Sequence, residues 1–240
     1  MKRIVISGTY CTGKTTFSLA LSALTGIPVT HARTMRELLP VMYPGKELRS
    51  CDYSELLCLG MRRFSERIAT EGHLGGSFIS DGCPLQEWIY GTTRLLTGAY
   101  PDETAAEFAL RQRSGGMSPE VFEQQLRAFG ELAKNYTQNH YDIFFHLPVE
   151  FPFVADGHRP TSEAFRQRSE ALLQQTYADT DISPYVLGGS IEKRLEQALD
   201  VLRLQACRSV ADAVRIAEAT RREKFDSIGL ERPKLRTSLL

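Results

Sequence analysis

The chain has 240 residues, of which 42% are hydrophobic and 24% charged, a composition that suits one α/β domain of ordinary size with a helical appendage. Its 29 lysines and arginines equal its 29 aspartates and glutamates, so no net charge draws it to nucleic acid or to an acidic membrane. No apolar run approaches the roughly 20 residues that span a bilayer. The five cysteines lack metal-ligand spacing, and no signal peptide precedes the first strand. We therefore expect a cytoplasmic protein whose cysteines are reduced.

The chain opens with a strand, a glycine-bounded loop and a helix. Residues 3–7 predict the strand and residues 14–24 the helix. The loop between them reads GTYCTGKT, the pattern of a phosphate-binding loop. Its glycines, Gly8 and Gly13, permit backbone angles that turn successive N–H groups inward at the start of the helix, where the helix dipole also favours an anion. The sequence therefore predicts a nucleoside triphosphate site, and the alternative is a plain glycine turn before a helix.

Two side chains of this loop are expected to act on the phosphates. Lys14 is predicted to reach the β- and γ-phosphates as a point charge, and the Thr15 hydroxyl is predicted to hold a Mg²⁺ ion that bridges the same oxygens. The expected cofactors are therefore ATP and Mg²⁺. The residues that we expect to bind the nucleotide in this loop are Gly8, Thr9, Tyr10, Cys11, Thr12, Gly13, Lys14, Thr15 and Thr16.

Beyond the first helix, strands and helices continue to alternate. In chain order we expect a strand at 27–32, a short charged segment at 33–39, a helix at 54–70, a strand at 77–80, helices at about 84–97, 102–112 and from 119 onward, a strand at 141–149, a helix at 161–178, a strand at 183–189 and two helices after 190. The helix at 54–70 is expected to bury the apolar residues that recur at helical spacing, namely Leu57, Met61, Phe64 and Ile68.

This alternation predicts a P-loop NTPase of the α/β class, with a mostly parallel five-stranded sheet that helices cover on both faces. We place a boundary after the P-loop domain, which covers 1–204, and assign 205–240 to a C-terminal helical appendage with a basic tail. Ligands of such sheets bind at the carboxyl ends of the strands, where the polar residues around 31–36 and Asp81 lie. A homodimer is left open.

Several stretches, in this order along the chain, resemble one known family. They are GTYCTGKTT, THARTMREL, Asp81 after the third strand, HLPVEFPFVADGHRP and VLGGSIEKRL. Over about residues 1–200 the chain resembles the small P-loop kinase-like ATPases that include the ribosylnicotinamide kinase domain and, more distantly, the deoxynucleoside and thymidylate kinases. The resemblance implies an ATP-dependent phosphotransferase that moves the γ-phosphate to a small-molecule acceptor, with a nucleoside or nucleotide as the first choice.

The resemblance also implies a catalytic role for Asp81. In such kinases a carboxylate near the end of the third strand takes the proton of the acceptor hydroxyl or orients Mg²⁺ through water, and Asp81 matches that position. The alternative is an aspartate that only caps the turn SDGCP. Relatives often carry a Glu at the end of the second strand, where this chain has Thr30 and His31 before Arg33. We expect His31 and Arg33 to contact the substrate, and a hydrogen-bonded structural histidine is the alternative for His31.

The segment ADGHRPTSEAFRQRSE resembles the mobile lid of these kinases, and we place the lid at about 155–168. Phosphoryl transfer spreads charge over the equatorial oxygens, so Arg159 is expected to stabilise that charge as a third catalytic residue beside Lys14 and Asp81. Arg166 lies two helical turns later and is expected to assist in nucleotide binding. The alternative for Arg166 is a solvated helix face on which it pairs with a neighbouring glutamate.

Missing motifs disfavour two other classes of P-loop protein. The sequence has no Asn-Lys-x-Asp motif for guanine, which disfavours a signalling GTPase, and its third strand ends in Asp-Gly rather than Asp-Glu, which disfavours an ATP-driven motor. The alternative that we retain is a nucleotide-dependent binding or switch protein without productive transfer. The last stretch, RREKFDSIGLERPKLRTSLL, is expected to be a loosely held tail or an interface arm. It resembles no nucleic-acid module, so nucleic acid is not an expected partner.

Overall fold

The computed structural model describes residues 1–30, 33–98, 104, 106–107, 109–110, 117–151 and 162–227, with only the backbone described at residue 49 and at 225–227. Its strands are β1 (Arg3–Ser7), β2 (Val29–Thr30), β3 (Phe78–Asp81), β4 (Ile143–His146) and β5 (Tyr185–Val186). They form a five-stranded sheet in the order β2-β3-β1-β4-β5, and every pairing is parallel. The predicted parallel sheet is therefore confirmed, with the strand that feeds the phosphate loop at its centre.

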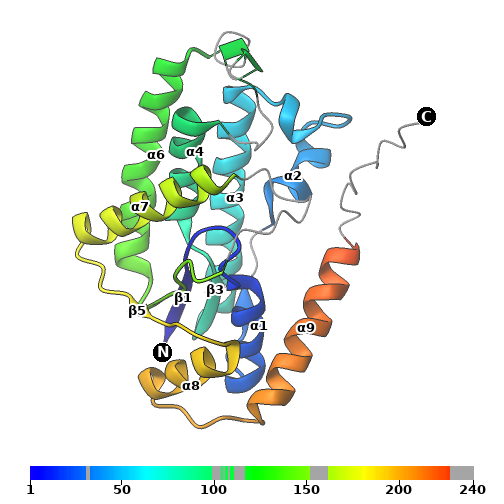
Figure 1. The fold of residues 1–240 in the computed structure, drawn as a ribbon, viewed down its shortest axis with the longest axis vertical. Helices are drawn as coiled ribbons and strands as arrows, with labels where there is room; N and C mark the ends of the chain where they lie inside the picture. Colours follow the sequence, from blue (N-terminus) through cyan, green and yellow to red (C-terminus); the bar gives the residue numbers. More distant parts are fainter. Residues whose placement is uncertain are drawn as a thin grey trace.

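Eight α-helices are described, and they lie on both faces and beyond one edge of the sheet (Figure 1). They are α1 (Lys14–Thr25), α2 (Met35–Met42), α3 (Tyr53–Leu74), α4 (Pro84–Thr97), α6 (Pro119–His140), α7 (Glu163–Asp179), α8 (Ile191–Leu202) and α9 (Val210–Ser227); a short 3-10 helix covers Leu48–Ser50. Residues 33–39, predicted only as a charged segment, contain the start of α2. This helix begins with a capping box, because the Thr34 hydroxyl accepts from the Glu37 N–H while the Glu37 carboxylate accepts from the Thr34 N–H.

The central strand shows how the two faces are filled. Ile4 and Ile6 of β1 belong to a core cluster with α1, α8 and α9, whereas Val5 points the opposite way into a cluster with α4 and α7. All three side chains are fully buried. Helices therefore cover both faces, as the alternating sequence predicts.

A third cluster joins α2, α3 and α6 above the carboxyl edge of the sheet, where Figure 1 shows α3, α4 and α6 rising together past the phosphate loop. The burial of α3 differs from the predicted apolar stripe. Phe64 is buried, and Leu57 and Ile68 are partly buried, but Met61 is half exposed. Instead, Arg67 and Glu71 are buried, because α3 turns a charged face toward β3 and α4.

The C-terminal helices pack on the start of the chain. α9 lies beside α1 (Figure 1), and its Ala213 and Ala217 are fully buried in the same cluster as Ile4. α9 continues to Ser227, so residues 221–227 of the predicted tail or interface arm are helical. The division after residue 204 remains a prediction.

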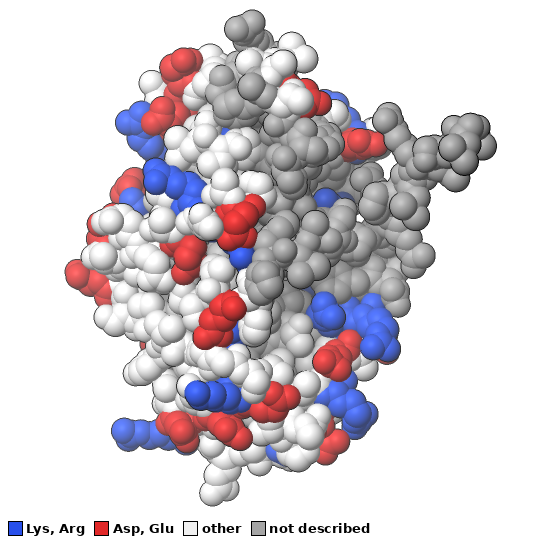
Figure 2. All heavy atoms as spheres, in the orientation of Figure 1, with Lys and Arg blue, Asp and Glu red and all other residues white. Residues whose placement is uncertain are grey.

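The surface carries charges of both signs. On the face shown in Figure 2, the described lysines and arginines are intermingled with aspartates and glutamates, in keeping with their equal numbers in the sequence. Within the described residues, no helix is both long and apolar enough to cross a membrane.

Candidate nucleotide site

The phosphate loop joins β1 to α1 at the carboxyl edge of the sheet. Its backbone enters the left-handed region at three positions, with φ of 134° at Gly8, 59° at Cys11 and 89° at Gly13. A Cβ at Gly8 would lie only 2.5 Å from the carbonyl oxygen of Leu147, so this position requires glycine. The conformation and the sequence agree on a loop built to close around an anion.

Some side chains of the loop are buried and support its backbone, whereas others are partly exposed. Thr9 and Thr12 are buried, and the Thr12 hydroxyl donates to the Thr9 carbonyl at 3.1 Å, which braces the loop from within. Lys14 donates through Nζ to the same carbonyl. Lys14 and Thr15 are only partly buried. The ammonium group is therefore held against the loop, where it would meet phosphate oxygens.

Asp81 lies beside the first turn of α1. The Thr15 hydroxyl donates to Asp81 Oδ2 at 2.8 Å, which joins the phosphate loop to the end of β3. Asp81 does not cap α4, whose N-cap is Cys83 with Gln86 completing the capping box. The Thr15 hydroxyl and the Asp81 carboxylate are hard oxygen donors of the kind that Mg²⁺ prefers, so these residues fit that ion. No cluster of three His, Cys, Asp or Glu ligands occurs in the part of the chain that the structure describes.

Arg194 supports the loop from α8, a contact that the sequence analysis did not assign. It is almost fully buried; Nη1 donates to the Thr12 carbonyl at 2.9 Å, and Nη2 pairs with Glu150 at 2.7 Å. Glu150 also accepts from the Gly189 N–H at 2.9 Å. The Gly-x-x-x-x-Arg spacing in VLGGSIEKRL was the signal for this residue, although it gave no contact.

Helix α4 attaches to the loop through its first two turns. Gln86 Nε2 donates to the Ser7 hydroxyl at 2.8 Å, and Tyr90 stacks on Tyr10 with ring centroids 4.1 Å apart. Tyr90 is buried, so the pair closes one side of the loop. Helix α4 and the phosphate loop are therefore in direct contact.

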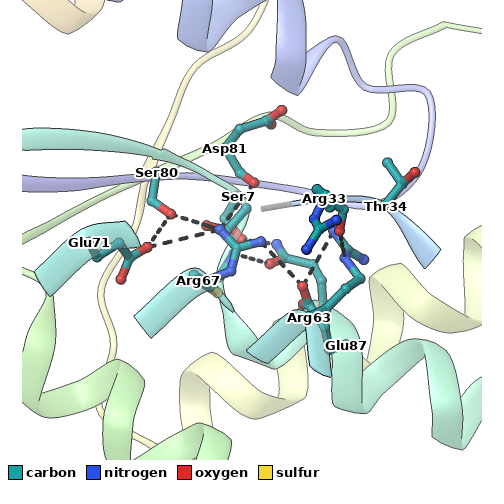
Figure 3. Close-up of polar contacts among 12 residues, drawn as sticks. Ser7, Arg33, Thr34, Arg63, Arg67, Glu71, Ser80, Asp81 and Glu87 are labelled. Atoms are coloured by element: carbon teal, nitrogen blue, oxygen red, sulfur yellow. Dashed lines mark hydrogen bonds and ion pairs between the residues drawn. The ribbon is translucent and has the colours of Figure 1, made fainter. Parts of the chain in front are cut away.

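A buried charge network holds the strand end that carries Asp81 (Figure 3). Arg67 donates through Nη1 to the Ser80 hydroxyl at 2.8 Å and to the carbonyls of Gly82 at 2.9 Å and Asp81 at 3.3 Å. Ser80 in turn donates to Glu71 at 2.6 Å. Burial lowers the pKa of Arg67, but the nearby acids outweigh it and raise the pKa above its ordinary value, so the guanidinium stays charged. Arg67 is thus a positioning residue for the backbone around Asp81.

The same network continues toward the end of β2. Glu87 accepts from Arg67 at 3.2 Å and pairs with Arg63 at 3.4 Å, and Arg63 Nε donates to the carbonyl of Arg33 at 2.8 Å (Figure 3). Burial raises the pKa of Glu87, but the charges of Arg63 and Arg67 outweigh that effect and lower it. The Arg33 side chain itself pairs with Glu66, so it has a carboxylate partner within the protein.

Some of the remaining predicted residues lie outside the described residues, and Arg166 lies within them. His31, Arg159 and lid residues 155–161 lie outside the described residues, and their roles remain predictions. Arg166 is buried rather than solvated; its guanidinium donates to the Phe151 carbonyl at 2.9 Å and pairs with Glu163 at 2.7 Å. Its backbone carbonyl accepts from Thr9 at 3.5 Å, so α7 does approach the phosphate loop.

An all-parallel sheet in this order, with a GTYCTGKT loop between its central strand and the next helix, defines a P-loop NTPase. The family model of the AAA domain matches residues 3–194, and the chain therefore belongs to that family. A comparison with curated proteins found no match.

Among solved structures, deoxyadenosine kinase from M. mycoides has a similar fold. The form with bound dATP has a TM-score of 0.57 and 13% identity over 85% of this chain and 100% of that one. The form with dCTP has a TM-score of 0.55 and 13% identity over 84% and 98%, and the form with the products dCMP and a flexible dCDP has 0.51 and 12% over 84% and 98%. These similarities confirm the predicted nucleoside kinase-like P-loop fold.

Proposed function

We propose that this protein is an ATP-dependent phosphotransferase whose acceptor is a small molecule, with a nucleoside or nucleotide as the first choice. The observation that carries this proposal is the 2.8 Å hydrogen bond from Thr15 to Asp81. It brings a carboxylate to the end of the loop where the γ-phosphate of ATP would lie. The similarity in fold to a deoxyadenosine kinase supports the same conclusion.

The residues present would divide the work of binding. The loop amides and Lys14 would hold the β- and γ-phosphates, and Arg194 would keep the loop in shape through the Thr12 carbonyl. Thr15 and Asp81 would hold Mg²⁺, which when bound supplies positive charge against the phosphate oxygens.

In the proposed reaction, the hydroxyl oxygen of the acceptor forms a bond to the γ-phosphorus of ATP. The bond from that phosphorus to the oxygen bridging the β- and γ-phosphates breaks, and ADP leaves with the electron pair. Asp81 takes the proton of the acceptor hydroxyl. Arg159 remains our proposed stabiliser of the transferring oxygens, whereas the Arg166 guanidinium, bound to Phe151 and Glu163, supports the structure next to the loop.

Single-turnover assays with γ-labelled ATP test the proposal. Purified protein is mixed with labelled ATP, Mg²⁺ and one member at a time of a panel of nucleosides and nucleotides, and the label is followed from ATP to acceptor. We expect transfer to at least one member at a rate well above that of ATP hydrolysis. Tight ATP binding with no transfer to any acceptor would favour the nucleotide-dependent switch protein instead.

A further inference from the structure

Four arginines are almost fully buried among the described residues, and one of them differs from the rest. Arg67, Arg166 and Arg194 each pair with a carboxylate, at 3.2, 2.7 and 2.7 Å respectively. Arg94, on α4, is only 6% exposed, yet its one hydrogen-bond contact within the described chain is to the Met35 sulfur, 3.8 Å from Nη2. A thioether is a weak acceptor without charge. Among the residues that the structure describes, Arg94 is therefore a buried cation without an anionic partner.

The surroundings of Arg94 do not offset this charge. Met35 is the first residue of α2, and the dipole of that helix places partial positive charge at this end. Burying an ion without a counter-ion is strongly unfavourable, and arginine does not escape by losing its proton. A buried cation of this kind is stabilised when an anion pairs with it.

The place of Arg94 in the fold connects it to the proposed acceptor. Glu87, Tyr90 and Arg94 follow the i, i+3, i+7 spacing that puts side chains on one face of α4. On this face Glu87 joins the network that holds Asp81, and Tyr90 stacks on the phosphate loop. Arg94 lies about 10 Å further along the helix axis than Glu87, by the rise of two turns. It thus lies on the same face of α4 as the residues that support Asp81 and contact the phosphate loop, about two helical turns from Glu87.

We propose that Arg94 binds an anionic oxygen group of the acceptor, remote from the hydroxyl that is phosphorylated, so that the acceptor is an acid-bearing nucleoside or nucleotide rather than a neutral nucleoside. The proposal rests on the phosphotransferase function given above. Carboxylate and phosphate both present oxygen pairs that match the planar fork of a guanidinium. The two sources are a carboxylate on the base and a phosphate on the ribose.

Calorimetric binding to protein saturated with a non-hydrolysable ATP analogue and Mg²⁺ separates these sources, because the analogue fills the phosphate loop. The ligands are matched pairs: orotidine against uridine for a base carboxylate, and the four ribonucleoside 3′-monophosphates against their nucleosides for a ribose phosphate. We expect at least one acid to bind about 10- to 100-fold more tightly than its neutral partner, as a charge-assisted hydrogen bond gives.

Variants at Arg94 test whether this residue causes the preference for the acid. R94Q should remove that preference and leave the neutral partner unchanged, R94K should keep part of it, and R127Q, at an exposed arginine of α6, should change nothing. Equal binding of acid and neutral ligands, binding of no acid, or a preference that survives in R94Q would each overturn the proposal. If an acid binds through Arg94 but no label transfers from ATP, the anion site at Arg94 stands and the phosphotransferase function is wrong.

Discussion

The phosphate side of the site and the side next to α3 and α4 depend on different interactions. On the phosphate side, one contiguous stretch from Gly8 to Thr15 carries the left-handed backbone positions and the lysine that we propose for phosphate binding. On the other side, charges from separate helices meet in the interior: Arg67 from α3 lies against Glu87 from α4. The first arrangement depends on backbone conformation and the second on burial of matched charges.

This difference determines what a substitution does on each side. A side chain that only faces the ligand can be removed with little loss of stability, because solvent takes its place. A buried ion pair cannot lose one member without leaving the other uncompensated. We therefore expect variants of the phosphate side to lose activity while folded, and variants of the buried network to lose stability as well.

A large effect on activity is expected for Lys14→Ala. Removal of the charge on the β- and γ-phosphates should lower the rate of phosphoryl transfer by about 10³-fold while the melting temperature changes little. Lys46→Ala, which removes an exposed lysine from the loop after α2, is the matched control and should leave the rate unchanged. Normal ATP binding and turnover in Lys14→Ala would contradict the prediction that this loop binds phosphate.

The next effect is expected for Arg67→Met. Because this change removes the arginine that pairs with buried Glu71 and leaves buried Glu87 with Arg63 alone, it should lower the free energy of unfolding by about 3–5 kcal/mol in a denaturant titration. Replacing Glu87 by Leu in the same chain should recover part of that loss. Arg127→Met, at an exposed pair on α6, should change stability by less than about 0.5 kcal/mol. Comparable losses at Arg67 and Arg127 would show that burial does not distinguish the two regions.

The smallest effect concerns His140, which stacks on Tyr136 at the edge of the network. Burial lowers its pKa below the ordinary 6.5, although Glu71 opposes this. The unfolded chain therefore takes up the proton at a higher pH than the folded one, so the contribution of His140 to stability is present above pH 6.5 and is lost as the pH falls through its folded pKa.

Melting temperatures at pH 7.5 and 5.5 test this sign. The wild type should lose more stability on acidification than His140→Phe, because the depressed carboxylate pKa values lie below this window and affect both proteins alike. A steeper loss in the variant would contradict the direction of the shift.

The sequence predicted the strand, loop and helix of the phosphate side well because their signal is local. The glycines of GTYCTGKT, the helix after it and Asp81 at the end of β3 can be recognised without knowing any distant contact. The buried network could not be found in this way. Arg67 and Glu71 interrupt the apolar pattern of α3 and are typical of a solvated face, whereas Met61 is typical of a buried one, and the structure reverses both.

Two further residues show how much depended on tertiary structure. Arg194 is separated from its partner Thr12 by most of the chain, so its spacing motif gave no contact until α8 was placed beside the loop. In the sequence, Arg94 is an ordinary residue of a helix. Only the described residues around it show that it has no carboxylate partner among them.

The central claim is that the carboxylate at the end of β3 serves phosphoryl transfer from the loop. Single-turnover transfer of labelled phosphate by Asp81→Asn tests it most directly, because asparagine keeps the shape and can still accept from Thr15 but cannot take a proton at neutral pH. Asp200→Asn, at an exposed position of α8, is the control. We predict a loss of about 10²–10⁴-fold in transfer with an unchanged melting temperature for Asp81→Asn. A normal transfer rate in that variant would contradict the account.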